Sequence, residues 1–146
     1  MSSRRTFIHQ SATLGAAAMV APSISFGSPV KAANDKLQIG IIGLGLRGTN
    51  HLQNALNRDD VMVTAIADVD PARIVIAQKA IAEAGGKPVK VFGKNDLDYR
   101  NLLALREVDA VLIATPWLWH TRMSVDAMKA GKYAGVEVSA AGTLEE

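Results

Sequence analysis

Residues 38–48, with the sequence QIGIIGLGLRG, constrain the fold of this chain more than any other segment. An apolar run leads directly into Gly43, Gly45 and Gly48, which have the G-x-G-x-x-G spacing of a dinucleotide-binding turn. In such a turn the first glycine allows the tight change from strand to helix. The second lets the backbone approach a pyrophosphate, and the third lets the helix pack closely on the strand. The segment therefore predicts a strand, a phosphate-binding turn and a helix, in that order.

Apolar runs alternate with helical patterns along the rest of the chain. Strands are predicted at 37–42, 61–67, 89–92, 110–114 and 133–138, and helices at about 47–57, 71–84, 96–106 and 119–130. Asp70 is the predicted cap of the second helix, and Gly85 and Gly86 end it. This alternation favours an α/β fold, and residues 34–146 are predicted to form an NAD(P)-binding Rossmann-type domain with a doubly wound parallel sheet.

The first 33 residues have the basic, apolar, small order of an export signal. Residues 3–8 (SRRTFI) resemble the twin-arginine consensus, 12–21 form a weakly apolar core, and 30–32 (VKA) offer a cleavage site. The alternative is an amphipathic or transmembrane helix. The apolar run is too short for a bilayer core of about 30 Å, and Pro22, Gly27 and Pro29 interrupt it. We therefore expect an exported, periplasmic protein with no stable membrane anchor.

The last four residues, TLEE at 143–146, form a capping box, which predicts a helix whose body the sequence does not contain. A sheet that ended with the strand at 133–138 would also leave an apolar edge open to pairing. We expect the chain to be the N-terminal part of a longer protein, truncated before the last strand of the sheet.

Composition excludes several classes of function. The 146 residues contain no cysteine, which rules out disulfides, thiolate catalysis and cysteine-ligated metals. The three histidines, at positions 9, 51 and 120, do not have the spacing of metal ligands, so no metal site is predicted. Without the three basic residues of the leader, thirteen basic residues face fourteen acidic ones, and no basic surface for nucleic acid is expected.

Asp68 supports the interpretation of the glycines as a dinucleotide-binding turn, because it ends the second predicted strand twenty residues after Gly48. An acidic side chain at this position accepts hydrogen bonds from the adenosine ribose, and its charge repels a 2′-phosphate. We therefore expect NAD as the cofactor in preference to NADP. The alternative is that Asp68 merely ends a strand, and Asp70 or Arg73 nearby could alter the phosphate preference.

Two residues near the glycines keep two interpretations each. Arg47 could lie along the pyrophosphate or reach toward a substrate, or it could be a solvated residue of the first helical turn. His51, one turn further on, is interpreted as a packing or surface histidine.

A second informative segment, ATPWLWH at 114–120, leaves the fourth predicted strand next to the glycine turn. Ligands of open α/β sheets bind beyond the carboxyl ends of the strands. Its two tryptophans could form a flat wall against a nucleotide or sugar, and His120 could bond a ligand or act as a cap or packing residue. The end of the fifth strand is expected at the same cleft. The predicted cofactor-binding residues are Gly43, Gly45, Leu46, Arg47, Gly48, Asp68, Thr115, Pro116, Trp117, Leu118, Trp119, His120, Glu137 and Val138.

Taken together, these segments show a family resemblance. The leader, GLGLRGTNH at 43–51, ADVD at 67–70, ATPWLWH at 114–120 and GVEVS at 135–139 resemble the glucose-fructose oxidoreductase, inositol dehydrogenase and MocA-like (Gfo/Idh/MocA) family. Within that family, the chain looks most like glycoside hydrolase family 109, the NAD-dependent α-N-acetylgalactosaminidases. Sugar dehydrogenases of the superfamily usually have Glu-Lys-Pro where this chain has Glu137, Val138 and Ser139. The hydrolases resemble this chain in lacking the lysine.

The resemblance implies a hydrolysis without net redox change. A sugar hydroxyl is oxidised by NAD, a base removes the adjacent proton, the aglycone leaves, and the hydride returns after water adds. In the family, the base and most sugar contacts belong to a C-terminal α+β domain, so no catalytic residue is expected within these 146 residues. The implied partner is a small (amino)sugar or glycoside, and the sequence leaves a homo-oligomer open. Two alternatives remain, a periplasmic NAD(P)-dependent sugar oxidoreductase and a non-catalytic nucleotide-binding module.

Overall fold

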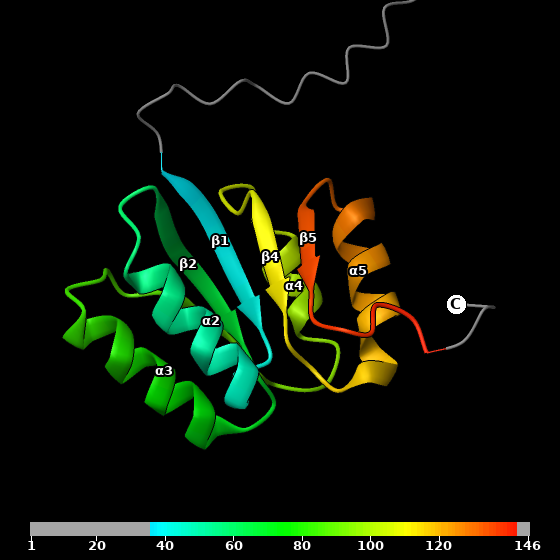
Figure 1. The fold of residues 1–146 in the computed structure, drawn as a ribbon, viewed down its shortest axis with the longest axis horizontal. Helices are drawn as coiled ribbons and strands as arrows, with labels where there is room; N and C mark the ends of the chain where they lie inside the picture. The colour runs from blue at the N-terminus through cyan, green and yellow to red at the C-terminus, as the bar shows by residue number, and fades with distance from the viewer. Residues whose placement is uncertain (1–35, 143–146) are drawn as a thin grey trace, which may run out of the picture. The chain divides into compact units, whose positions relative to one another are not determined.

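Five parallel strands form one sheet in the order β3-β2-β1-β4-β5 (Figure 1). The computed structural model describes residues 36–142, so the predicted export signal at 1–33 and the capping box at 143–146 lie outside the described residues. The elements, in chain order, are β1 (Leu37–Ile42), α2 (Leu46–Leu56), β2 (Val61–Ala67), α3 (Pro71–Glu83), β3 (Lys90–Phe92), α4 (Tyr99–Leu103), β4 (Ala110–Ile113), the 3-10 turn η1 (Trp117–Trp119), α5 (His120–Lys129) and β5 (Tyr133–Val136).

Strand β1 is the centre of the sheet, where the strand order reverses. It pairs with β2 on one side, Leu37 opposite Val61, and with β4 on the other, Ile39 opposite Ala110. The chain first winds outward through β2 and β3 and then returns to β4 and β5. The prediction of a Rossmann-type doubly wound sheet is thereby confirmed, and the crevice at the reversal is where such sheets bind ligands.

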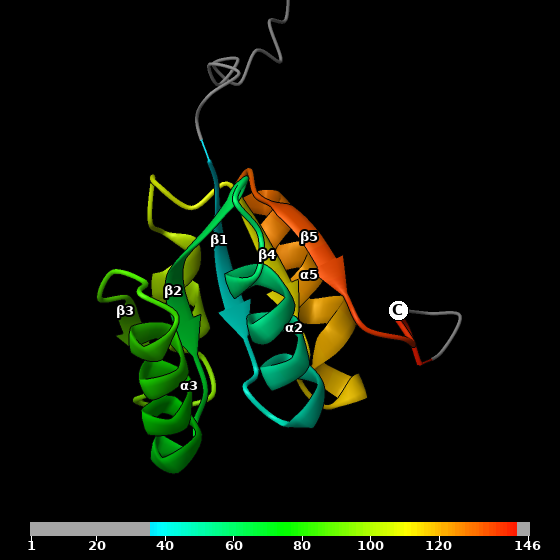
Figure 2. The same cartoon turned by 60° about the vertical axis from the view of Figure 1, so that its left-hand side comes forward.

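Two apolar clusters cover the two faces of the sheet (Figures 1 and 2). Helices α2 and α3 cover one face, where Leu52 and Ile81 pack on Ile41 and Ile66. Helices α4 and α5 cover the other, where Leu102 and Met123 belong to the second cluster. Because both faces are buried, the strands consist of nearly continuous apolar runs, and this is why the sequence predicted β1 and β2 with their observed ends.

Helix α4 is much shorter than the predicted helix at 96–106. The carboxylate of Asp98 accepts hydrogen bonds from the amides of Gly93 and Lys94, and the side chain of Asn95 accepts one from Leu97. Such local bonds from side chains compete with helical ones and hold the chain in turns as far as residue 98. The helix that follows Pro116 also starts later, at His120, because η1 precedes it.

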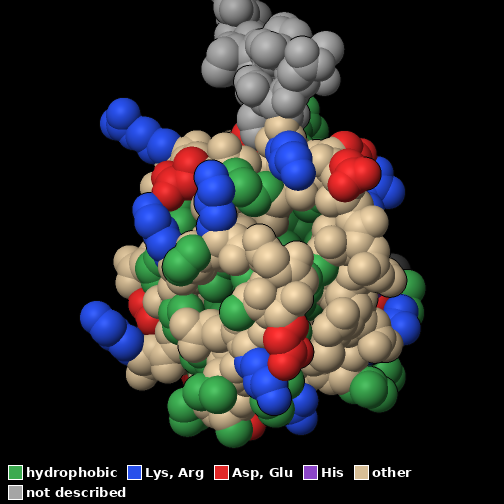
Figure 3. Space-filling model, turned by 90° about the vertical axis from the view of Figure 1, so that its left-hand side faces the viewer, with side chains coloured by type: hydrophobic (Ala, Val, Ile, Leu, Met, Phe, Trp, Pro, Cys, Tyr) green, Lys and Arg blue, Asp and Glu red, His purple; other side chains and the backbone are tan. Residues whose placement is uncertain are grey.

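The face of the domain beside α3 carries charges of both signs. Asp and Glu side chains are scattered there among Lys and Arg, and apolar side chains lie between them (Figure 3). Among residues 36–142, no helix is long and apolar enough to cross a membrane, and no three His, Cys, Asp or Glu side chains gather as metal ligands would.

Candidate functional site

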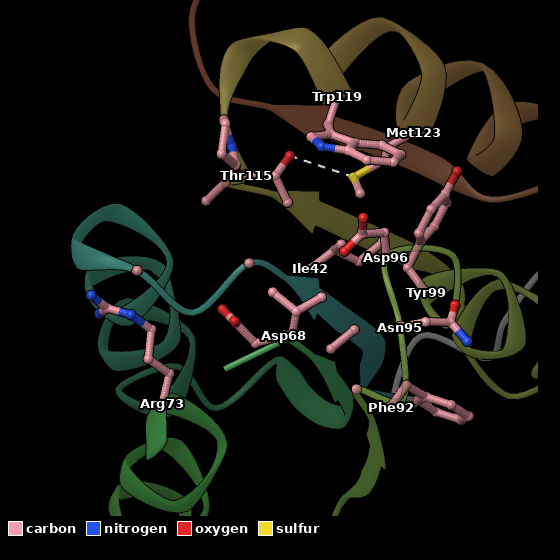
Figure 4. A pocket seen from close by; sticks show the side chains of 17 residues that line it. Ile42, Asp68, Arg73, Phe92, Asn95, Asp96, Tyr99, Thr115, Trp119 and Met123 are labelled. Atoms are coloured by element: carbon pink, nitrogen blue, oxygen red, sulfur yellow. Dashed lines mark hydrogen bonds between the residues drawn. The ribbon is translucent and has the colours of Figure 1, made fainter. Parts of the chain in front are cut away.

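A cavity of about 320 Å³ opens at the carboxyl ends of β1, β2 and β4, beside the loop after β3 (Figure 4). Its walls combine the glycine turn with the acid after β2 and an apolar side formed by α4 and the segment after β4. The lining residues are Ile42, Gly43, Gly45, Ala67, Asp68, Val69, Arg73, Phe92, Gly93, Asn95, Asp96, Tyr99, Ala114, Thr115, Pro116, Trp119 and Met123.

The three glycines of the turn serve different purposes. Gly43 has a φ of 86°, and a Cβ there would lie 2.8 Å from the backbone of Ala114. A Cβ on Gly48 would collide with the carbonyl oxygen of Gly43. At Gly45, by contrast, a Cβ would meet no atom within 4 Å. The protein's own packing therefore requires the first and third glycines, whereas the second borders open space at the start of α2.

Helix α2 begins at this open space without a side-chain cap. Its first amide bonded within the helix is that of Thr49, which donates to the carbonyl of Gly45 at 2.8 Å. Amides of a first helical turn have no partner inside the helix, and together with the helix dipole they attract an anion. The space beside Gly45 is therefore open and has the polarity that favours an anion such as a pyrophosphate.

Asp68 connects the second strand to the glycine turn. Its Oδ2 accepts a hydrogen bond from the amide of Leu44 at 2.5 Å, and its Oδ1 accepts one from the amide of Asp70 at 2.9 Å. Each carboxylate oxygen has a second lone pair, so Asp68 can hold the turn and still accept hydroxyl groups from a ligand in the cavity. The carboxylate points into the cavity, beside the turn (Figure 4).

Only some of the residues predicted to bind the cofactor in the segment after β4 line the cavity. Thr115, Pro116 and Trp119 line it, and the guanidinium of Arg122 lies 5.5 Å from the centre of the Trp119 ring. Trp117 and Leu118 do not line it and are 71% and 75% exposed. Of the two tryptophans, therefore, Trp119 forms the aromatic wall.

His120 is buried, with an exposed fraction of 1%, and it does not line the cavity. Its Nδ1 lies 2.8 Å from the carbonyl oxygen of Ser139, and its Nε2 lies 2.8 Å from that of Thr115. Both ring nitrogens thus contact backbone, and the imidazole joins the loop after β4 to the loop after β5. This placement matches the packing alternative for His120, and a direct bond to a ligand would have to displace one of these carbonyls.

A second polar cluster lies at the end of β5, outside the cavity. Oε1 of Glu137 accepts hydrogen bonds from Nε and Nη2 of Arg47 at 3.2 and 2.9 Å, and it lies 2.6 Å from Nε2 of His51. The contact with His51 first, and those with Arg47 second, lower the pKa of Glu137 below its ordinary value. Glu137 is therefore an anion held by two side chains of α2. Near it, Val138 and Leu46 are 80% and 78% exposed.

Sequence reasoning missed the side of the cavity formed by the end of β3, the loop after it, α4 and α5. Phe92, Asn95, Asp96, Tyr99 and Met123 all line it. The available signal was topological, because the loop after β3 must lie beside the end of β2 in a doubly wound sheet. Sequence reasoning also gave His51 no partner, and its pairing with Glu137 links residues 86 positions apart.

The loop after β3 is held in place by Asp98, which is 5% exposed. Besides the amides of Gly93 and Lys94, its carboxylate accepts a hydrogen bond from the side chain of Asn101 at 2.7 Å. The Lys94 amide and the Asn101 side chain are the main causes that lower the pKa of Asp98. The loop that lines the cavity is therefore anchored by an ionised carboxylate.

These features together fit NAD. The space beside Gly45 suits the pyrophosphate, Asp68 suits the adenosine ribose, and the apolar wall with Trp119 suits the adenine. Arg47, His51 and Glu137 then lie on the β5 side of the glycine turn, away from this adenosine end.

Comparison with known proteins agrees with this geometry. Residues 37–138 match the Gfo/Idh/MocA family model, described as an oxidoreductase family with an NAD-binding Rossmann fold. A glycosyl hydrolase family 109 protein of Shewanella sp. (strain ANA-3) is 39% identical over 158 aligned residues, which cover 98% of this chain and 35% of that protein. Another, from Parabacteroides distasonis, is 45% identical over 112 residues, covering 76% of this chain and 24% of that one. The chain thus spans about a third or less of the curated relatives it matches.

Two solved structures are also similar. Scyllo-inositol dehydrogenase from Lactobacillus casei, with bound NAD(H) and scyllo-inositol, is 27% identical with a TM-score of 0.65, over 76% of this chain and 30% of that one. A variant 3-ketoreductase from Actinomadura kijaniata, in complex with TDP-benzene and NADP, is 28% identical with a TM-score of 0.58, over 73% of this chain and 31% of that one.

Proposed function

The chain belongs to the Gfo/Idh/MocA family of oxidoreductases with an NAD-binding Rossmann fold, and from this premise we propose that it is the NAD-binding part of an exported glycosidase acting on α-N-acetylgalactosaminides. Relatives named as glycosyl hydrolase family 109 proteins support this function at 39% and 45% identity. The chain by itself has no catalytic base in this proposal, and a further part of the protein supplies the base and most of the sugar contacts.

The observation that carries the proposal is the end of β5. The sequence there, Glu137, Val138 and Ser139, lacks the lysine that sugar dehydrogenases of the superfamily usually have. Val138 is exposed and apolar, whereas Glu137 is paired with Arg47 and His51. No side chain at position 138 can therefore exchange a proton with a substrate. This favours a reaction in which the proton is taken by a group elsewhere in the protein.

The roles of the chain's own residues follow from their positions. The amides at the start of α2 and Gly45 hold the pyrophosphate, Asp68 orients the adenosine ribose, and Trp119 packs against the adenine. NAD, when bound, supplies an acceptor for a hydride that it can later return. Arg47 and Glu137 lie outside the cavity, on the β5 side of the glycine turn, where their ion pair keeps this end of the site polar.

Export with the cofactor bound would suit such an enzyme. Because the proposed reaction returns the hydride, NAD need not be exchanged, and a periplasmic enzyme would require no local supply. The leader at 1–33 motivates this proposal. Replacing Arg4 and Arg5 by lysine should keep the protein in the cytoplasm, as cell fractionation would show, and unchanged export of that variant would contradict it.

The decisive experiment uses the full-length product of the gene that encodes this chain. Purified from its host without added NAD and given p-nitrophenyl α-N-acetylgalactosaminide, it should release nitrophenol with no net accumulation of NADH. The 146-residue chain should bind NAD but release nothing. Accumulation of NADH without nitrophenol would contradict the glycosidase and support the second candidate, a sugar oxidoreductase, which the similarity to scyllo-inositol dehydrogenase favours.

A further inference from the structure

The ribose end of the cavity has a second carboxylate next to Asp68. Asp70 caps helix α3, because its Oδ1 accepts a hydrogen bond from the amide of Ala72 at 2.8 Å. Its other oxygen, Oδ2, lies 3.8 Å from Nε of Arg73. One carboxylate oxygen of Asp70 therefore caps the helix, and the other forms an ion pair with Arg73.

Arg73 is the one cation among the described residues that line the cavity. Its Nη1 lies 3.5 Å from the carbonyl oxygen of Leu44, in the glycine turn, and its side chain is 48% exposed. Figure 4 shows its guanidinium beside the turn, on the same side of the cavity as Asp68. Arg73 is thus the lining cation that could bind a phosphate on the adenosine ribose if its guanidinium left its contacts with Leu44 and Asp70.

This arrangement raises a question of specificity, because similar structures hold either cofactor. One contains NAD(H) and another NADP. An arginine near the ribose accommodates a 2′-phosphate in proteins of this fold, whereas an acid at the end of the second strand excludes it. This chain has both an acid and an arginine at the ribose end, so Asp68 alone does not decide whether NAD or NADP binds more tightly.

We propose that Asp70 is a second determinant of the preference for NAD, and that it acts by holding Arg73 away from the position of a 2′-phosphate. The bond to the Ala72 amide fixes Asp70, and the fixed carboxylate attracts the guanidinium along the first turn of α3. Asp68 repels the 2′-phosphate directly, and Asp70 withholds the cation that would bind it. This inference rests on the NAD-binding fold and is independent of the glycosidase proposal.

The test changes the charge of Asp70 and keeps its cap. Asn caps a helix as well as Asp does, so Asp70→Asn should leave the unfolding temperature almost unchanged. Isothermal titration of the full chain with NAD and with NADP should show NAD affinity within about twofold of the parent and NADP affinity raised about tenfold. The gain should shrink as salt is raised, since both groups are partly exposed.

The matched control is the same change in a chain that lacks the cation. In an Arg73→Gln background, Asp70→Asn should leave the ratio of the two affinities unchanged. An unchanged ratio in the single variant would overturn the proposal, and so would a tenfold gain that persists without Arg73, because Asp70 would then act on the phosphate directly. Neither titration depends on turnover, so failure of the glycosidase assay would not alter these results.

Discussion

The carboxylate of Glu137 lies 2.6 Å from Nε2 of His51 and so joins the end of β5 to the second turn of helix α2. Arg47, on the same helix, completes the cluster at 2.9 Å. The cluster is the only polar connection by side chains that the structure describes between these two elements. The contribution of Glu137 to the stability of the fold should therefore depend on pH.

Because its pKa is lowered in the folded chain, Glu137 stabilises the fold above the ordinary pKa of a glutamate, about 4.3, and this contribution is lost as the pH falls through the folded pKa. Glu137→Gln removes the charge at every pH. The variant should therefore unfold at a lower temperature than the parent at pH 6, and the difference should narrow toward pH 3. Thermal unfolding followed by circular dichroism measures both, and a difference that stays constant with pH would contradict the assignment.

Gly45 and Gly48 should respond differently to the addition of one methyl group. Gly45→Ala places it in open space, so we expect a loss of stability of about 1 kcal/mol or less but a drop in NAD affinity of tenfold or more, about 1.4 kcal/mol. Gly48→Ala forces the methyl onto the carbonyl of Gly43 and should prevent folding. Titration calorimetry and circular dichroism distinguish the two effects. Unchanged NAD binding by Gly45→Ala would contradict a pyrophosphate at this turn.

The two tryptophans after β4 provide a matched pair. Trp119 lines the cavity and Trp117 is largely exposed. Trp119→Ala should weaken NAD binding about tenfold, because stacking of a base on an aromatic ring contributes about 1–3 kcal/mol. Trp117→Ala should change it less than about twofold. Quenching of tryptophan fluorescence by NAD should survive in the Trp117 variant and disappear in the Trp119 variant, and the reverse pattern would place the adenine elsewhere.

Asp98 does not line the cavity, but its removal should be costly because it holds the loop that does. Asp98→Ala leaves the amides of Gly93 and Lys94 without their acceptor in a partly buried setting, at a cost of about 3 kcal/mol. The pKa of Asp98 is lowered in the folded chain, so its contribution is fully present above the ordinary pKa of an aspartate, about 3.9, and is lost as the pH falls through the lower folded pKa. Urea unfolding at pH 7 measures the effect, with exposed Asp59→Ala as the control. A change below about 0.5 kcal/mol would show that the loop does not depend on this side chain.

Local patterns predicted the fold well. Strands β1 and β2 were predicted with their observed ends, because their side chains are buried on both faces and leave a continuous apolar run. The cap Asp70 and the first-turn proline Pro71 marked the start of α3 correctly. Helix α4 was predicted too long, since the apolar spacing of Tyr99, Leu102 and Leu103 cannot reveal that Asp98 binds the amides before it.

The predicted site was less complete, for a different reason. Asp68 and the glycines were identifiable because their positions along the chain are set by one β-α-β unit. His120 could not be interpreted in the same way, because its partners, Thr115 and Ser139, belong to separate loops. The periodicity of a sequence indicates on which side of a helix or strand a residue lies, but it does not indicate which residues of other segments contact it.

The sequence by itself determined the succession of strands and helices, the glycine turn and the acid after β2, because each depends on residues close together in the chain. Only the tertiary structure decided that Glu137 meets His51 and Arg47, and that Arg73 stands beside the turn held by Asp68. The physical reason is the order of the strands. Because β4 and β5 add on the other side of β1, the end of β5 lies beside helix α2. Glu137 and His51 are 86 positions apart in the chain, so no local sequence pattern indicates their contact.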